Sequence, residues 1–289
     1  DGICSGDITV IEAKPDRILP ELLPFIIQND DLFDFAVGKS AGSLSPRVKW
    51  EHLKNYEFEL PDMEKQKELA ELLWAMDNTK KSYQKLIAAT DELVKSQFME
   101  LFGDPVTNTQ GREVRPFKDF MLDIRYGTSQ PPTFNELGEF KFIRATNIKA
   151  GRITENGMLR ISADEAAKIE KCRLNGNEII IVRSGANTGD TCVVTDEYRD
   201  QYAGYDIIVT LNLEIANPVF FNELMNTHYM QAIIKPLTVR AAQPHINSEQ
   251  VQNLPMLVVP LQEQEQFATF VRQSDKSKFA ALSCSHLNL

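Results

Sequence analysis

The sequence has few of the residues that build disulfide frameworks or metal sites. It contains only four cysteines, at positions 4, 172, 192 and 284, and no C-x-x-C pair, so the spacing supports neither disulfides nor a zinc site. Its four histidines form no H-E-x-x-H motif and no i,i+4 pair, so we do not expect them to bind a metal. We therefore expect a reduced, cytoplasmic chain that binds no metal.

The sequence also lacks long apolar runs and an excess of positive charge. No segment approaches the ~18 consecutive apolar residues of a membrane span, and no secretory signal begins the chain, so we expect no membrane association. Acidic side chains outnumber basic ones 41 to 31 over the 289 residues. The excess is uneven, because residues 1–61 carry 11 acidic and 6 basic side chains whereas residues 103–289 carry 22 and 19. The net charge of −10 therefore leaves room for a local basic surface that contacts nucleic acid.

What the sequence does contain is an internal repeat. Short matches recur in order at a nearly constant offset of 198 or 199 positions, and they run from residue 7 to the end of the first repeat near residue 66. Examples are Pro20 with Pro218 and Leu60-Pro61 with Val259-Pro260, each followed by an acidic, glutamine-rich helix start. Residues 1 to about 100 thus repeat residues 200–289, and the chain comprises about one and a half copies of a unit.

Within a copy, the pattern predicts an α+β globule followed by a long helix. Apolar clusters predict strands at 142–143, 178–182, 192–194 and 207–213, with helices at 162–171 and 218–234. Residues 62–101 contain no glycine or proline, so they predict one helix of roughly 60 Å. A half-apolar seven-residue seam along it is suited to helix pairing, and the segment from Gln262 is its expected antiparallel partner.

Motifs for catalysis are weak. Asn217-Pro218-Val219-Phe220 is close to the tetrapeptide with which adenine-amino methyltransferases grip their target, but we interpret it as a strand end before a helix that starts with proline. The loop 184–190 lacks the Lys-Ser/Thr ending of a phosphate loop. Asp62 is better suited to cap a helix than to serve a nuclease.

Three loops and one strand end carry residues suited to DNA. Asn and Gln bind adenine edges, Arg binds guanine, and hydroxyl or backbone N–H groups hold phosphates. The candidate DNA-binding residues are Tyr126, Thr128, Ser129, Gln130, Arg144, Asn147, Lys149, Arg152, Arg183, Ser184, Asn187, Thr188, Arg240, Gln243 and His245.

These segments resemble a known family, the type I restriction-modification DNA specificity subunits. The resemblance is carried by Phe140-x-Phe142-Ile143-Arg144-x-x-Asn147-Ile148-x-x-Gly151-x-Ile153, by Asn175-Gly176-Asn177-Glu178-Ile179-Ile180 and Ser184-Gly185-x-x-x-Gly189, and by Ala241-Ala242-Gln243-Pro244-His245-Ile246-Asn247. It covers residues 112–275 and implies mixed α/β target recognition domains separated by long coiled-coil-forming helices. The implied domains are the C-terminal half of a first recognition domain (1–61), a spacer helix (62–103), a complete second recognition domain (104–260) and the start of a second spacer helix (261–289).

The resemblance implies a noncatalytic subunit that reads one half-site of a bipartite double-stranded DNA target. Its helices would dock methyltransferase subunits, and motor-nuclease subunits would join for restriction, a defence against foreign DNA. S-adenosylmethionine, ATP and Mg would be bound by those partners and no cofactor by this chain. The expected docking residues are Leu69, Leu72, Met76, Tyr83, Leu86, Leu93, Phe267, Phe270 and Val271.

Three alternatives stay open from the residues alone. A stand-alone adenine methyltransferase or nuclease would bind S-adenosylmethionine or metal by itself. A coiled-coil scaffold would have no role on DNA. A chain with one and a half repeats could also associate with a second copy of itself to restore two recognition sites.

Overall fold

The computed structural model describes residues 4–5, 8–40, 47–238 and 244–285, and it contains two compact units. Unit 1 comprises Asp1–Ile87 and Ala281–Leu289, and unit 2 comprises Ala88–Ala280. Helix α4 (Met63–Phe102) begins in unit 1 and ends in unit 2, which confirms the long helix expected over 62–101. Its N-terminus is capped as predicted, because the Asp62 carboxylate accepts a hydrogen bond from Lys65 N at 2.9 Å.

Unit 1 consists of short helices and the first part of α4, on which α1 packs. They are α1 (Leu23–Ile27), α2 (Asp30–Gly38) and α3 (Trp50–Leu53). The Trp74 ring of α4 meets Phe25 edge-on at 5.1 Å between centroids, and its Nε1 donates to Glu21 O at 2.9 Å. An aromatic contact and a hydrogen bond from one side chain thus hold α1 on the long helix.

Unit 2 is a mixed α+β globule, which confirms the expected fold class. Its central sheet has the order β2-β10-β7-β8, and a second sheet has the order β6-β3-β9. Two smaller pairs, β1-β11 and β4-β5, complete the strands found in the described part of the chain. The bounds are β1 (Val114–Pro116), β2 (Met121–Tyr126), β3 (Phe140–Ile143), β4 (Ile148–Lys149), β5 (Arg152–Ile153), β6 (Leu159–Ile161), β7 (Ile179–Ile181), β8 (Thr191–Val193), β9 (Tyr202–Ala203), β10 (Ile207–Leu211) and β11 (Pro255–Leu257).

The two middle strands of the central sheet are apolar throughout because both of their faces are covered. Ile179, Ile180 and Ile181 of β7 have no exposed surface, and neither have the first three residues of β10. One face packs on a phenylalanine-rich core that includes Phe117, Phe220 and Phe221, and the other packs on a smaller core that contains Ile143. A continuous apolar run therefore marks a strand buried on both sides.

The remaining helical segments of unit 2 differ from the prediction at one place. They are α5 (Ala163–Lys168), α6 (Pro218–Asn226), α7 (His228–Thr238), α8 (Ser248–Gln252) and α9 (Leu261–Ser285), with short 3-10 turns at Phe117–Phe120, Ala145–Asn147, Glu170–Cys172 and Asp196–Tyr198. The single helix expected over 218–234 is wrong. Thr227 is extended (ψ 149°) and its hydroxyl accepts from Met230 N at 3.2 Å, so it ends α6 and caps α7.

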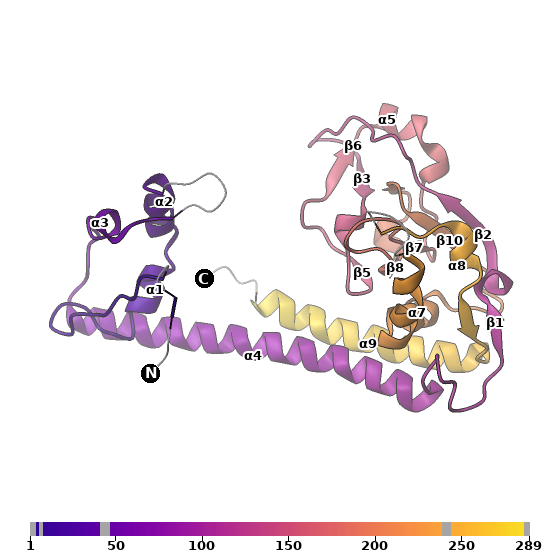
Figure 1. The fold of residues 1–289 in the computed structure, drawn as a ribbon, viewed down its shortest axis with the longest axis horizontal. Helices are drawn as coiled ribbons and strands as arrows, with labels where there is room; N and C mark the ends of the chain where they lie inside the picture. Colours follow the sequence, from indigo (N-terminus) through magenta and orange to yellow (C-terminus); the bar gives the residue numbers. More distant parts are fainter. Residues whose placement is uncertain (1–3, 6–7, 41–46, 239–243, 286–289) are drawn as a thin grey trace. The chain divides into compact units, whose positions relative to one another are not determined.

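Within unit 2, the last turns of α4 run antiparallel to α9, as the sequence predicts (Figure 1). Phe98 and Phe102 each meet Phe267 with ring centroids 5.5 Å apart. About two turns before Phe98, Asp91 of α4 is hydrogen-bonded to Lys278, which lies about three turns after Phe267 on α9. Successive contacts therefore run toward the N-terminus of α4 and toward the C-terminus of α9. Phe220 of α6 joins the cluster, so the helix pair is part of the core of unit 2.

The predicted repeat is confirmed by two buried glutamines with the same bonding pattern. Gln66 accepts from Leu19 N and donates to Arg17 O and Pro61 O. Gln264 accepts from Asn217 N and donates to Ile215 O and Val259 O. Every residue of the second network lies 198 positions after its counterpart in the first. The starts of α2 and α7, of α3 and α8, and of α4 and α9 keep the same offset.

The two copies differ in the burial of matching residues. Ile207 and Val209 of β10 are fully buried, whereas Ile8 and Val10, which occupy the matching positions of the first repeat, are 60% and 70% exposed. Among the described residues of unit 1, no strand pairs with this segment. Only in unit 2 are the matching residues covered by neighbouring strands in the described part of the chain.

Candidate DNA interface

The candidate residues of unit 2 come together because several strands end at one edge of the central sheet. Tyr126, the last residue of β2, lies opposite Ile207 at the start of β10, and Ile181 at the end of β7 lies opposite the same residue. Arg183 follows Ile181 by two positions and Tyr205 precedes Ile207 by two. Antiparallel pairing on both sides of β10 therefore brings three distant segments to one place.

At this edge the Arg183 guanidinium lies between two aromatic rings. Its carbon is 4.6 Å from the ring centroid of Tyr126 and 4.5 Å from that of Tyr205, and each contact is an attractive cation–π interaction. The Tyr126 hydroxyl accepts a hydrogen bond from Ser248 N at 2.8 Å. The Arg183 backbone is also held, since its N–H donates to Asp206 Oδ1 at 3.0 Å. Burial raises the pKa of Asp206 to about 6, although Arg183 opposes the shift.

The stacked arginine lines a cleft of about 570 Å³. We call it the aromatic cleft, and it is lined by Tyr126, Gly127, Thr128, Ser129, Gln130, Pro131, Pro132, Glu165, Lys168, Ile169, Lys171, Arg183 and Tyr205. One wall is the predicted loop after β2, in which Thr128 Oγ1 donates to Gln130 O at 2.9 Å. The other wall is α5 with the turn after it. A cleft with aromatic and cationic walls can receive a planar, electron-rich group.

Gly127 is required where this loop leaves the sheet. A Cβ on Gly127 would lie 1.5 Å from the carbonyl oxygen of Gly204, which is far inside van der Waals contact. The close approach of the two backbones sets the place from which Thr128, Ser129 and Gln130 start. Ser129 and Gln130 are exposed.

A second pair of predicted loops lies side by side. Ser184 forms a bridge with His245, Gly185 N donates to Pro244 O at 3.2 Å, and Ile246 N donates to Arg183 O at 2.9 Å. Thr188 is almost buried and its hydroxyl bonds Gly185 O at 2.6 Å, so it shapes the loop. Asn187 is half-buried and His245 is exposed. The predicted residues Arg240 and Gln243 lie outside the described residues.

The third predicted loop, the β4–β5 hairpin, has a different role for two of its residues. Asn147 is fully buried, and its amide donates to Thr154 O and Asn156 O while its oxygen accepts from Arg144 N. Its side chain thus holds the loop together and does not face solvent. Arg144 follows the end of β3 and donates to Gly157 O at 2.8 Å.

The tip of the hairpin is a two-residue turn. Ala150 and Gly151 both have positive φ, 49° and 79°, as a type I′ turn requires. Lys149, just before the turn, is exposed and remains accessible to a phosphate. Arg152, just after it, forms an ion pair with Asp275 of α9, and this ion pair fixes the hairpin to the helix pair.

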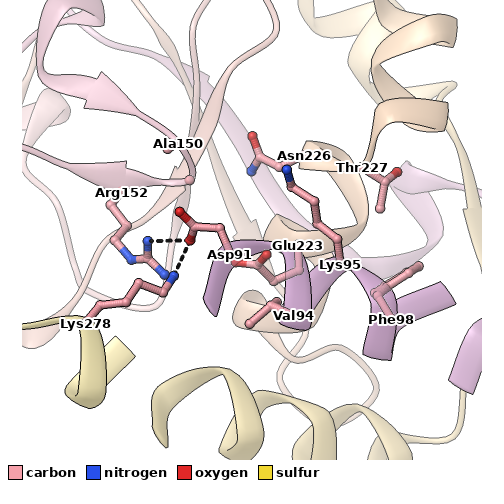
Figure 2. Close-up of a pocket in the computed structure, with 11 residues that line it drawn as sticks. Asp91, Val94, Lys95, Phe98, Ala150, Arg152, Glu223, Asn226, Thr227 and Lys278 are labelled. Carbon is pink, nitrogen blue, oxygen red and sulfur yellow. Dashed lines mark hydrogen bonds and ion pairs between the residues drawn. The ribbon is translucent and has the colours of Figure 1, made fainter. Parts of the chain in front are cut away.

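Arg152 also lines a smaller pocket of about 230 Å³, together with Asp91 and Lys278 (Figure 2). Lys278 is 6% exposed and contacts both Asp91 and Asp275, and Arg152 Nη1 reaches Asp91 at 4.0 Å. Two cations and two carboxylates therefore alternate and balance. Burial raises the pKa of the nearby Glu223 carboxyl, against the attraction of Arg152. The pocket is a structural junction of hairpin, α4, α6 and α9.

The predicted docking residues of α4 are mostly exposed, whereas those of α9 are mostly buried. Leu69, Leu72, Leu86 and Leu93 of α4 are 39%, 57%, 52% and 51% exposed, and Met76 and Tyr83 are half-buried. On α9, by contrast, Phe267 and Val271 are buried in the core of unit 2 and Phe270 packs against it. The α9 residues thus join the helix pair to its own globule, while the α4 leucines face outward.

Sequence reasoning missed three residues of the aromatic cleft. Tyr205, Lys168 and Lys171 were not among the candidates, although each lines the cleft with Arg183. A weak sequence indication did exist for Tyr205, because it is an exposed aromatic residue next to Gly204 and lies just before a buried strand. The two lysines lie on a predicted helix and carried no signal of their own.

Two other features are absent from the described residues. No group of three or more His, Cys, Asp or Glu side chains comes together there to hold a metal ion. Within the same ranges, no helix is both long and apolar enough to cross a membrane.

The fold and site define a class: an α+β recognition globule, with a cationic, aromatic cleft at a strand edge, built onto an antiparallel helix pair. The model of one family, described as "Type I restriction modification DNA specificity domain", matches residues 113–282. Because this match covers more than half of the chain, the chain belongs to the type I restriction-modification DNA specificity family, and it is a type I specificity subunit.

Solved structures agree on the fold. The chain is similar to the type I restriction-modification S subunit from M. genitalium, with a TM-score of 0.56 and 15% identity over 90% of this chain and 69% of that one. It is also similar to a chain from a structure of type I restriction-modification complex assembly and conformational transition, with a TM-score of 0.53 and 18% identity. That match covers 95% of this chain and 69% of the other.

Proposed function

We propose that this chain is the noncatalytic, DNA-reading subunit of a type I restriction-modification complex. Unit 2 reads one half-site of a bipartite double-stranded target, and the exposed leucines of α4 dock methyltransferase subunits. The single observation that carries the proposal is the aromatic cleft: it lies in the family-matched region, and three strand ends bring Tyr126, Arg183 and Tyr205 to it.

The chemistry of the proposed interface divides into two parts. Exposed Lys149 and the side chains of Ser184 and Asn187 suit phosphates, which position a protein on the duplex. Gln130 and Arg183 suit base edges in the major groove. Arg144 and Asn147 support the loop that presents Lys149, and Arg152 anchors it to α9.

The partners supply the reaction in this scheme. Methyltransferase subunits bind S-adenosylmethionine, and motor-nuclease subunits bind ATP and Mg, while this chain binds none of them. A second copy of the chain is a further candidate partner, since the described residues of unit 1 form no sheet like that of unit 2 and a second copy would bring a second cleft.

The test is a binding-site selection on the full chain with its methyltransferase partner. We expect one enriched half-site of a few base pairs, bound more than about 1,000-fold tighter than random DNA at physiological salt. Equal binding of all sequences at every salt concentration would refute DNA reading. Titration of S-adenosylmethionine into the chain alone tests the enzyme alternative, for which heat of binding would be the positive result.

Docking is tested separately by co-purification of the methyltransferase. Leu93→Glu on the exposed face of α4 should abolish co-purification, because it places a charge where apolar contact is expected. Gln84→Glu, an exposed position on the same helix with the same charge change, is the matched control and should leave co-purification intact. If both variants retain the partner, this face of α4 is not the docking surface.

A further inference from the structure

The Arg183 guanidinium is held in a way that a solvated loop arginine is not. Both of its faces are covered, by Tyr126 at 4.6 Å and by Tyr205 at 4.5 Å. Within the described residues, no hydrogen bond or ion pair occupies its N–H groups, and only the Arg183 backbone N–H is bonded, to Asp206. A cation that is stacked on two sides and unbonded at its edge is prepared for a ligand that meets the edge.

The geometry of the guanidinium restricts that ligand. Its N–H groups lie in the plane of the group and diverge as a fork, so a partner must offer two acceptors side by side in the same plane. In duplex DNA, two groups do this: guanine, through O6 and N7 in the major groove, and a phosphate, through two of its oxygens.

The surroundings favour the base over the phosphate. The carboxylate of Glu165 lines the same cleft but is paired with Lys168, and Lys171 lines the cleft as well, so the charges of the cleft do not discriminate between a base and a phosphate. The aromatic walls do, because they can stack on a planar base and not on a tetrahedral phosphate. The fixed rings also remove much of the rotamer entropy that arginine would lose on binding.

The two rings contribute unequally. Tyr126 ends a strand and its hydroxyl is bonded to Ser248 N, so its ring is fixed from within. Tyr205 is 44% exposed and closes the stack from the solvent side. Loss of Tyr205 would free the outer face of Arg183 and let the guanidinium turn away.

We propose that Arg183 reads a guanine of the half-site through O6 and N7, and that Tyr205 is a positioning residue that holds the guanidinium in the reading plane. This inference rests on the proposed function and names the base that the aromatic cleft recognises.

The experiment compares variants of the full chain, with the methyltransferase partner, by binding-site selection and by titration at several salt concentrations. Wild type should require guanine at one position of the half-site. Arg183→Lys keeps the charge but loses the fork, so discrimination at that position should fall by about 10-fold to 100-fold. Affinity for DNA without the guanine should stay within about 2-fold, and the other positions should keep their preference.

Tyr205 is tested by a conservative pair. Tyr205→Phe keeps the ring and should retain full discrimination, whereas Tyr205→Leu removes it and should lose about 10-fold at the same position and nowhere else. Lys149→Gln is the control for a phosphate contact, and it should weaken all sequences alike. Thermal melting of each variant checks that the fold is kept, and Tyr205→Phe also reports on the stack if the leucine variant melts early.

Each outcome decides the inference. Loss of one guanine preference in both Arg183→Lys and Tyr205→Leu supports it. Equal weakening of all sequences by Arg183→Lys, with a smaller salt dependence, identifies a phosphate contact and overturns it while the proposed function stands. A wild-type complex without any sequence preference overturns both.

Discussion

Gln264→Leu should destabilise unit 2 by about 3 kcal/mol. The buried amide makes three hydrogen bonds to backbone groups, with Asn217 N at 2.8 Å, Ile215 O at 3.1 Å and Val259 O at 2.7 Å. Each bond contributes a net ~1 kcal/mol, and removal of one partner leaves a buried group unsatisfied. Leucine nearly matches glutamine in size, so hydrogen bonding dominates the effect and cavity formation adds little.

The assay is urea unfolding of the full chain, followed by two probes. At an m-value of about 2 kcal/mol/M, a loss of about 3 kcal/mol shifts the midpoint by about 1.5 M. Hydrogen exchange of peptides that cover β10 reports on unit 2. Fluorescence reports on unit 1, because the only two tryptophans are Trp50 and Trp74.

A matched pair of variants checks the reasoning. Gln66→Leu removes the equivalent network of unit 1 and should shift the fluorescence midpoint more than the exchange of β10. Gln262→Leu lies on the same turn of α9 as Gln264 but is exposed, so it should change stability by less than about 0.5 kcal/mol. A shift for Gln264→Leu no larger than for Gln262→Leu would refute the assigned role of the buried amide.

Three further predictions concern the frame of unit 2. Lys278→Met removes a buried cation that neutralises two carboxylates, and we expect a loss of about 3 kcal/mol in urea unfolding, whereas exposed Lys276→Met should have almost no effect. Asp206 has a folded-state pKa of about 6 against an ordinary 3.8, so the folded state binds the proton more readily than the unfolded state. The contribution of this group to stability therefore falls by roughly 3 kcal/mol as the pH rises from about 4 to about 6. Unfolding of Asp206→Asn across pH 4–7 should lack that decline, and a pH profile identical to that of the wild type would contradict the prediction. Gly127→Ala should lower the melting temperature, at a cost of about 2 kcal/mol or more because of the backbone clash, whereas Gly38→Ala, where nothing lies within 4 Å, should not.

Local features of the fold were predictable where a single short-range rule governs them. The absence of glycine and proline predicted α4, the run of isoleucines predicted β7, and Asp62 caps a helix as expected. The break at Thr227 was not predicted, since no glycine or proline marks it. The break depends on the Thr227 hydroxyl, which caps the next helix. Threonine does not cap a helix at most positions, so its presence did not predict the break.

The candidate site was predictable as a set of loops but not as a set of contacts. Residue type alone made Asn147 and Arg152 resemble DNA ligands. The structure assigns the first to a buried turn and the second to an ion pair with a residue 123 positions away. Tyr205 was missed because its partner, Arg183, is brought near only by strand pairing on both sides of β10. Long-range contacts, which the sequence pattern does not specify, decided the roles of Arg152 and Tyr205, whereas Asn147 is held by hydrogen bonds within its own loop.

The arrangement at the end of the central sheet has a consequence for how such a protein diversifies. The ladder of β2, β10 and β7 is made by backbone groups, and its middle strands are buried on both faces, while Ser129, Gln130 and Tyr205 line the cleft from exposed positions beyond the ladder. Substitutions at those three exposed positions leave the ladder and the core untouched, unlike substitutions of Tyr126 or Gly127. Mutation can therefore change what the cleft accepts at little risk to folding, so new variants of this surface can arise by single steps that each leave a working scaffold.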